Sequence, residues 1–316
     1  MKQFVYSLCF LIASFNAQSS VTDSSFTETK VVLETATGKI YGSLIVPLDY
    51  KEGPVVLIIA GSGPTDRNGN NPMMKNNSLQ QLALGLSNKG IASLRFDKRG
   101  VAESAGALKK ESELRFDDFV ADASAWVELL KADKRFTEII IAGHSEGSLI
   151  GMIAAQKHCS KFISIAGAGE PANITIRKQL ASQPSQVTDI AYPVLDSIAA
   201  GHLVSEVRPM LFSLFRPSVQ PYLISWFKYN PKTEIKKLTI PVLIIQGTTD
   251  IQVAIDDAKN LQSAKPDAKL LIIENMNHVL KIVSADRTEN IKSYSNPDLP
   301  IANELMENII SFIRKG

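Results

Sequence analysis

Short β-branched runs alternate with longer amphipathic stretches along most of the chain. Two runs, at residues 31–33 and 40–46, flank Thr37 and Gly38, a pattern typical of an antiparallel pair joined by a turn. The continuously apolar run at residues 55–60 indicates a strand that is covered on both faces of a sheet. We predict further strands at residues 91–96, 139–142, 162–166, 242–246 and 270–273, and helices at residues 78–89, 116–131, 147–158, 253–263 and 301–314.

The middle of the chain departs from this alternation. Residues 167–238 contain helical pieces, several prolines and many aromatic side chains, and no clear strand interrupts them. The repeated strand–helix order on both sides predicts a mostly parallel sheet with helices on both faces. We therefore expect one core built from residues 18–166 and 239–316, with residues 167–238 inserted as a helical cap over one end of the sheet.

The first residues have the pattern of a secretory signal. Lys2 supplies the positive start, residues 4–15 are mostly apolar, and Ala17 is a small residue suited to a cleavage site. The apolar stretch is too short to span a bilayer, and no later run is long enough. We therefore expect a signal peptide at residues 1–17, export to the periplasm or the extracellular space, and a mature chain without a membrane span. The alternative is a buried N-terminal strand or helix.

Composition narrows the range of partners and cofactors. The formal net charge is only +2 and no dense lysine or arginine run occurs, so a nucleic-acid partner has little electrostatic support. Of the two cysteines, Cys9 falls within the signal segment, which leaves Cys159 as a small buried residue without a disulfide partner in the mature chain. The sequence shows no cluster of histidine, cysteine and acidic residues with metal-ligand spacing, so we expect no metal site.

Residues 143–147 read Gly-His-Ser-Glu-Gly and lie between a predicted buried strand and a predicted helix. In that setting the Gly-x-Ser-x-Gly pattern is typical of a strained turn that lifts a serine hydroxyl clear of the sheet. The flanking positions need glycine because neighbouring backbone passes close by. The motif therefore predicts Ser145 as a nucleophile, beside helix N–H groups that can stabilise an oxyanion.

A serine hydroxyl needs a histidine to accept its proton and an acid to orient that histidine. In hydrolases with this turn, both partners follow the serine along the chain. Of four histidines, only His278 follows a later predicted strand, whereas the other three lie in the turn, in the next helix or in the insertion: His144, His158 and His202. Asp250 follows the strand before it, and its rivals Asp256 and Asp257 lie on a predicted helix.

An oxyanion hole requires two backbone donors. We predict one from Glu146, the residue after the nucleophile. The other should come from the loop after the strand at residues 55–60, which reads Gly-Ser-Gly-Pro, and Ser62 is the expected donor. The simplest alternative for this loop is an ordinary tight turn.

These motifs together resemble the α/β-hydrolase family, in particular the branch with serine-aminopeptidase-like hydrolases, monoglyceride lipases and feruloyl or cinnamoyl esterases. The resemblance rests on residues 60–64 (Ala-Gly-Ser-Gly-Pro), 95–100 (Arg-Phe-Asp-Lys-Arg-Gly), 143–147, 247–250 (Gly-Thr-Thr-Asp) and 277–278 (Asn-His). It implies an α/β-hydrolase fold and acyl-transfer chemistry. The branch usually has His-Gly where this chain has Ala60 and Gly61, and the run at residues 61–70 resembles exported bacterial carboxylesterase-like hydrolases.

Several charged residues near these motifs are assigned to structure. The resemblance implies a turn near the site that contains Asp97, Arg99 and Gly100, and we expect packing and hydrogen bonding there instead of substrate contact. Asp66 and Arg67 either line the pocket or pair within their loop. No particular residue of the insertion is singled out for substrate binding.

We therefore expect a serine hydrolase that cleaves carboxylic esters of small or medium acyl groups through an acyl-enzyme on Ser145, without a cofactor. The partner is then a small-molecule ester. One alternative is a serine aminopeptidase acting on short peptides, which needs an acid in the cap to hold the substrate's amino group; the acids available there are Glu170, Glu206 and Glu234. Another alternative is a binding protein that kept the fold without catalysis. The oligomeric state is left open by the sequence.

Overall fold

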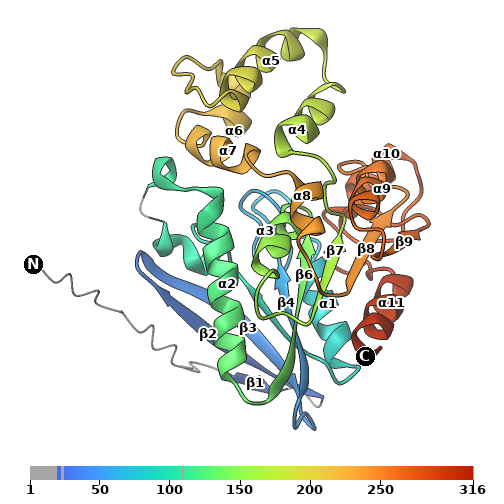
Figure 1. Ribbon diagram of the computed structural model, residues 1–316. Coiled ribbons are helices and arrows are strands. Elements are labelled where there is room, and N and C mark those ends of the chain that lie inside the picture. Colours follow the sequence, from blue (N-terminus) through green and yellow to red (C-terminus); the bar gives the residue numbers. More distant parts are fainter. Residues whose placement is uncertain (1–19, 23–24, 109, 316) are drawn as a thin grey trace, which may run out of the picture.

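The computed structural model describes residues 20–22, 25–108 and 110–315 (Figure 1). The signal peptide predicted at residues 1–17 lies outside these residues. The described residues form one nine-stranded sheet in the order β1-β2-β3-β5-β4-β6-β7-β8-β9. The strands are β1 (Ser20–Thr22), β2 (Phe26–Thr35), β3 (Gly38–Pro47), β4 (Gly53–Ile59), β5 (Ala92–Phe96), β6 (Phe136–His144), β7 (Lys161–Ile165), β8 (Val242–Gly247) and β9 (Lys269–Ile273).

The sheet is antiparallel at one end and parallel over the rest. β1, β2, β3 and β5 pair antiparallel in that order, whereas β5, β4, β6, β7, β8 and β9 pair parallel. The expected pair of antiparallel strands is confirmed, but both are longer than predicted. The first half of β2 is only partly buried and contains polar residues. Apolar runs in the sequence therefore did not indicate this part of the strand. The carboxyl ends of the parallel strands meet at one edge, where the loops carry the predicted site.

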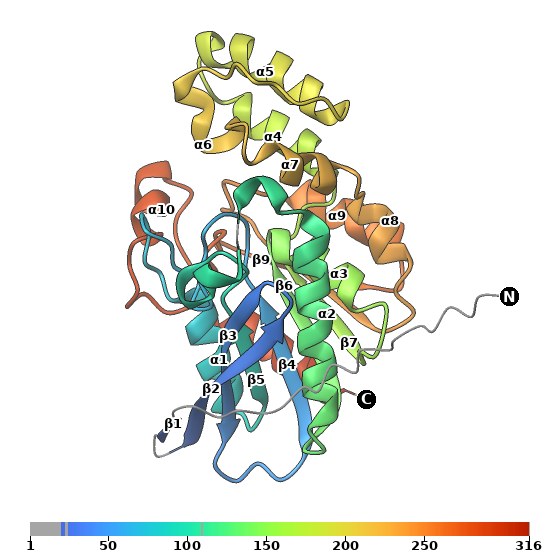
Figure 2. The same ribbon diagram turned by 90° about the vertical axis from the view of Figure 1, so that its left-hand side faces the viewer.

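Helices cover both faces of the sheet (Figure 2). One hydrophobic cluster joins the sheet to α2, α3 and α9, and a second joins it to α1 and α11. This arrangement confirms the α/β-hydrolase fold class with its mostly parallel sheet. The helices are α1 (Ser78–Ser87), α2 (Phe116–Ala132), α3 (Glu146–Ala154), α4 (Ala172–Leu180), α5 (Ser185–Ala199), α6 (Phe212–Phe215), α7 (Gln220–Phe227), α8 (Pro231–Lys236), α9 (Ile255–Ala264), α10 (Arg287–Ser293) and α11 (Asn303–Arg314), with 3₁₀ turns η1 (Ala102–Ala107), η2 (Glu111–Glu113) and η3 (Pro209–Leu211).

The centre of the sheet explains why its strands read as continuous apolar runs. Every residue from Val55 to Ile59 in β4 is at most 1% exposed, because helices lie above and below it. Trp126 of α2 is fully buried against the sheet and tilts over Phe96 with ring centroids 5.7 Å apart. Burial of such aromatic surface is a large stabilising contribution to the core.

Five helices, α4–α8, follow β7 and precede β8, and we call them the cap. In Figures 1 and 2, α4–α7 form a layer above the sheet, whereas α8 lies lower, near α3 and α9. The cap touches the core through contacts of α7 with α2 and of α8 with α3 and α9. Among the described residues, none of the helices is both long enough and apolar enough to cross a membrane.

Candidate active site

Ser145 lies on a strained turn between β6, which ends at His144, and α3, which begins at Glu146. Its backbone has φ 54° and ψ −122°, a conformation that residues with a side chain rarely adopt. The glycines beside it are required by close contacts. A Cβ on Gly143 would lie 2.2 Å from the carbonyl oxygen of Gly147, and one on Gly147 would lie 2.4 Å from that of Ile59. The turn therefore has the geometry expected for a nucleophile.

Asp250 and His278 come together from the loops after β8 and β9. Oδ2 of Asp250 accepts a hydrogen bond from Nδ1 of His278 at 2.8 Å, and both side chains are buried. Oδ1 of Asp250 accepts from the N–H groups of Gln252 and Val253 at 2.8 and 3.0 Å. Gln246 donates to Oδ2 at 3.0 Å, so the carboxylate is held from several sides.

The charge of Asp250 follows from these contacts. Burial raises the pKa of its carboxyl, but attraction to His278 and the hydrogen bonds from His278, Val253 and Gln252 outweigh burial and leave the pKa below its usual value. An ionised Asp250 fixes the proton of the neutral imidazole on Nδ1. This leaves Nε2 of His278 to accept a proton.

Ser145 and His278 line the same cavity of about 250 Å³, together with the loop that contains Ser62. Among the described residues, no hydrogen bond joins Oγ of Ser145 to His278. Contacts of this kind are often long without substrate and tighten in the complex. The structure thus places Ser145 and His278 at one cavity, and Asp250 contacts His278 from behind the cavity lining.

The loop with the second predicted oxyanion donor lies directly against the nucleophile. A Cβ on Gly61 would lie 3.1 Å from Cβ of Ser145, so glycine permits the close approach. Ser62 lines the cavity beside Ser145, and Glu146 begins α3, where the first N–H groups have no partner within the helix. The two residues that are predicted to supply the donors therefore both lie next to Ser145.

The other histidines and acids have different roles. His158 contacts Nζ of Lys131 at 2.9 Å, and His202 is exposed in the cap. Asp256 is exposed in the first turn of α9 and pairs with Lys259. Asp257 accepts from the N–H groups of Ala254 and Gly169 at 3.2 and 2.9 Å, so it caps that helix and does not reach His278.

The charged loop before α1 has a structural role. Arg67 forms a buried ion pair with Asp97 at 2.7 Å and also contacts Glu103, so it pairs with the segment after β5 and not within its own loop. Oδ1 of Asp66 accepts from the N–H groups of Asn68 and Asn70, within the same loop.

The expected turn after β5 is also structural. Arg99 pairs with Asp122 of α2 at 2.6 Å, and Gly100 has φ 84°, which favours glycine. The side chains of Asp97 and Arg99 thus serve packing and hydrogen bonding, as expected.

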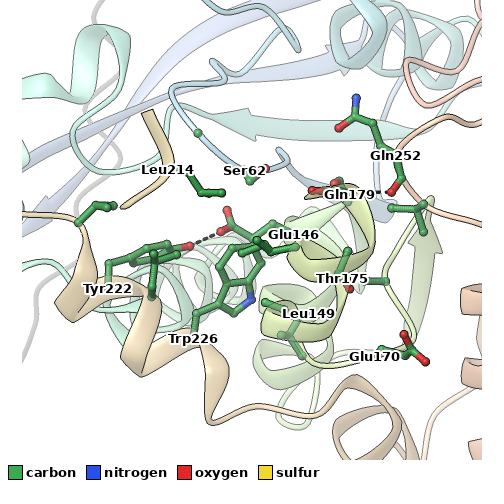
Figure 3. A pocket seen from close by; sticks show the side chains of 18 of the residues that line it. Ser62, Glu146, Leu149, Glu170, Thr175, Gln179, Leu214, Tyr222, Trp226 and Gln252 are labelled. Carbon is green, nitrogen blue, oxygen red and sulfur yellow. Dashed lines mark hydrogen bonds between the residues drawn. The ribbon is translucent and has the colours of Figure 1, made fainter. Parts of the chain in front are cut away.

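A larger cavity of about 490 Å³ lies between the core and the cap and shares Ser62 and Ser145 with the first (Figure 3). Its walls come from α3, α4 and α7, including Leu149, Ile176, Leu223 and Trp226. The lining is mostly apolar, as is usual for sites that bind organic molecules. A substrate that reaches Ser145 can therefore place an apolar part here.

Two residues of this region were not singled out from the sequence. Lys98, at the end of β5, and Tyr222, on α7 of the cap, both contact the side chain of Glu146. The sequence holds only a faint signal for Lys98, a charged residue directly after a buried strand. Tyr222 was one of many aromatic residues in the insertion.

Comparison with known proteins agrees with this architecture. Residues 74–213 match the sequence model of a family described as serine aminopeptidase, S33. Esterase EstD of Thermotoga maritima is 28% identical over 277 residues, which are 82% of this chain and 61% of the esterase. The chain thus spans about three fifths of the length of that relative.

Solved esterase structures share the fold at low sequence identity. Est1E of Butyrivibrio proteoclasticus, solved with ferulic acid bound, is 17% identical with a TM-score of 0.62, over 89% of this chain and 98% of that one. Esterase Pf2001 of Pyrococcus furiosus is 15% identical with a TM-score of 0.56, over 95% of this chain and 98% of that one. The sheet, its helices and the turn at Ser145 define an α/β protein with a hydrolase-type site. The chain thus has the α/β-hydrolase fold, and its residues 74–213 are similar to the serine aminopeptidase family.

Proposed function

We propose that this protein is a serine esterase that cleaves carboxylic esters of small or medium acyl groups. The observation that carries the proposal is the 2.8 Å hydrogen bond between Asp250 and His278 beside a cavity that Ser145 also lines. Further support comes from the esterase similarity and from the apolar cavity of about 490 Å³ next to Ser145. No cofactor takes part in the proposed reaction.

In the proposed reaction, Oγ of Ser145 attacks the ester carbonyl while Nε2 of His278 takes its proton. Asp250 keeps the ring in the required tautomer and stabilises the imidazolium. The N–H groups of Ser62 and Glu146 stabilise the oxyanion. His278 then protonates the leaving alkoxide, which departs as the alcohol. Water, deprotonated by His278, attacks the acyl-enzyme, and His278 returns that proton to Oγ of Ser145 as the carboxylic acid leaves.

Nitrophenyl esters of increasing acyl length provide the direct test. We expect hydrolysis to be fastest for short and medium chains, and labelling by a fluorophosphonate probe to be lost in Ser145→Ala. A folded protein that hydrolyses no ester and takes up no probe would contradict the proposal and favour a non-catalytic binding protein. Labelling without ester hydrolysis would support Ser145 as a nucleophile but contradict esters as the substrate class.

An aminopeptidase activity is the second candidate, because residues 74–213 match the serine aminopeptidase model and one cap acid lines the larger cavity. That acid is Glu170, which also pairs with Lys178. Glu206 is exposed and Glu234 binds Gln156 and Lys237, so neither of these two lines the cavity. Comparing kcat/KM for peptide amides and for esters discriminates the two activities, and we expect esters to be preferred.

We also propose that the protein is exported, on the basis of the apolar segment that follows Lys2. The test is to express the full chain in a bacterium and to determine, from the mass of the purified protein, the residue at which it begins. Recovery of a chain that begins near residue 18 in the periplasm or medium is expected. A chain that retains Met1 and stays in the cytoplasm would contradict export.

A further inference from the structure

Lys98 is a buried lysine that lies two residues after the carboxyl end of β5. Its side chain is 2% exposed, and Nζ donates to the carbonyl oxygen of Gly61 at 2.6 Å and to Oε2 of Glu146 at 2.7 Å. The ammonium group also lies 4.8 Å from the ring centroid of Phe119. A charge so far from water is costly unless it is paired and hydrogen-bonded, so these contacts account for how the fold tolerates it.

The contact with Gly61 acts on the predicted oxyanion hole. The carbonyl of Gly61 and the N–H of Ser62 belong to the same planar peptide unit, so holding the oxygen also fixes the direction of the N–H group. A positive charge at the oxygen polarises the peptide and makes its N–H a stronger donor. Lys98 therefore controls both the aim and the strength of one of the two predicted donors.

The contact with Glu146 acts on the other donor. Glu146 supplies the second N–H group from its backbone, and its buried carboxylate places a negative charge near the developing oxyanion. Unopposed, that charge would repel the oxyanion in a site of low dielectric. The ion pair with Lys98 cancels it at 2.7 Å.

Tyr222 connects this ion pair to the cap. Its hydroxyl donates to Oε1 of Glu146, as the dashed line in Figure 3 marks. Burial, followed by the charge of Glu146, raises the pKa of Tyr222 well above its usual value, so the hydroxyl keeps its proton and serves as a donor. The ring lies against Phe119 and Trp226, with centroids 5.7 and 5.8 Å away. The position of α7 is thereby linked to the residue that begins α3.

We propose that Lys98 is a positioning residue of the oxyanion hole, which orients and polarises the Gly61–Ser62 peptide and neutralises Glu146, and that Tyr222 couples the same network to the cap. This inference rests on the proposed esterase function and deepens it. It assigns a role in transition-state stabilisation to a lysine that touches neither the nucleophile nor its base.

The main test compares Lys98→Met with a matched control, Lys161→Met. Lys161 is also a buried lysine that donates to backbone carbonyls, those of Ile313 and Lys315 at 2.6 and 2.7 Å, but it lies at the opposite end of the sheet, where β7 begins. We expect Lys98→Met to lower kcat about 10- to 100-fold with KM within about three-fold. Lys161→Met should lower the melting temperature and leave kcat unchanged.

A transition-state analogue provides a readout that a purely structural role would not change. A trifluoromethyl ketone adds to Ser145 and forms an oxyanion in the hole, whereas the product carboxylate does not. We expect Lys98→Met to weaken inhibition by the ketone by a factor similar to its loss in kcat/KM, and to change product inhibition much less. Lys98→Arg, which keeps charge and donors, should recover part of both losses.

The remaining variants guard against a folding defect. If Lys98→Met does not fold, Lys98→Gln provides the same comparison, because it keeps an N–H donor but not the charge.

Tyr222→Phe should lower kcat about three- to ten-fold by removing one partner of Glu146. If the wild type is an active esterase and a folded Lys98 variant has unchanged kcat and ketone affinity, the proposed role of Lys98 is wrong but the proposed function is not. Absence of wild-type esterase activity and of fluorophosphonate labelling would instead reject the proposed function.

Discussion

Nε2 of His144 donates a hydrogen bond to the main-chain carbonyl oxygen of His278 at 2.8 Å, and the two ring centroids lie 4.8 Å apart. Burial lowers the pKa of His144 to about 3, and the neighbouring His278 adds to this effect. The ring is therefore neutral near pH 7, and because a carbonyl only accepts, its proton is on Nε2. His144 thus supports the loop of the predicted base from within the turn of the nucleophile.

The neutral state of His144 predicts a loss of stability in acid. Its pKa is about 3 in the folded chain and near 6.5 in the unfolded chain, so the unfolded state binds more protons between these values. The free energy of unfolding therefore falls as the pH drops below about 6.5. His144→Gln keeps a donor but does not titrate. Between pH 6.5 and 5, we expect wild type to lose about 2 kcal/mol more than the variant in urea denaturation. Parallel losses would contradict this assignment.

The pairing of Asp250 with His278 predicts a large catalytic effect of Asp250→Asn. An amide that donates to Nδ1 would force the other tautomer, with the proton on Nε2, and the ring could not accept a proton from Ser145. We expect kcat for a nitrophenyl ester to fall about ten-thousand-fold, with circular dichroism unchanged.

The control for that variant is Asp256→Asn, in the exposed first turn of α9. It should change kcat by less than about two-fold, because its side chain is exposed and pairs with Lys259. A larger loss in Asp256→Asn than in Asp250→Asn would reverse the assignment of the acid.

The features that could be predicted from the sequence each lie within a short stretch of the chain. The turn at Ser145 is contained in five residues, and Asp250 and His278 each follow a strand that apolar runs disclose, so their place at one edge of the sheet could be predicted. Their catalytic roles stay predictions. Lys98 and Tyr222 were missed because their common partner, Glu146, is 48 and 76 residues away, and no periodicity records such a contact.

The boundaries of several elements were also hard to predict. Helix α10, Arg287–Ser293, has a polar sequence without a long apolar face, so no helical periodicity marked it. Helix α3 ends at Ala154 instead of continuing to His158, and His158 has φ 60°, outside the helical region. Short-range pattern thus identified the central strands and failed where polar surface or backbone turns decide the structure.

The close packing of the turn at Ser145 predicts that Gly143→Ala is severely destabilising. The new Cβ would lie 2.2 Å from the carbonyl oxygen of Gly147, so β6 and α3 must separate. We expect a loss of about 3 kcal/mol or more in the free energy of unfolding and loss of esterase activity in any folded fraction. Gly106→Ala, where no atom of the described residues lies within 4 Å of the new Cβ, should stay within about 0.5 kcal/mol of wild type. Equal stability of the two variants would contradict the packing argument.

The larger cavity predicts that acyl-chain preference is set by the cap. Trp226 of α7 lines this cavity and stacks on Phe116, with ring centroids 6.0 Å apart and an interplanar angle of 4°. Trp226→Ala would extend the apolar space, and each further buried methylene contributes about 0.8 kcal/mol. We therefore expect the ratio of kcat/KM for decanoyl to butyryl nitrophenyl esters to rise about ten-fold.

A second aromatic residue of the cap serves as the control for this preference. Phe212 of α6 is 45% exposed and does not line the cavity, so Phe212→Ala removes apolar surface from the cap without changing the space beside Ser145. Its ratio of kcat/KM for the two esters should equal that of wild type. If both variants shift the ratio alike, the preference follows from general loosening of the cap. If neither does, the acyl group does not occupy the cavity beside Trp226, and the smaller cavity beside His278 must hold it instead.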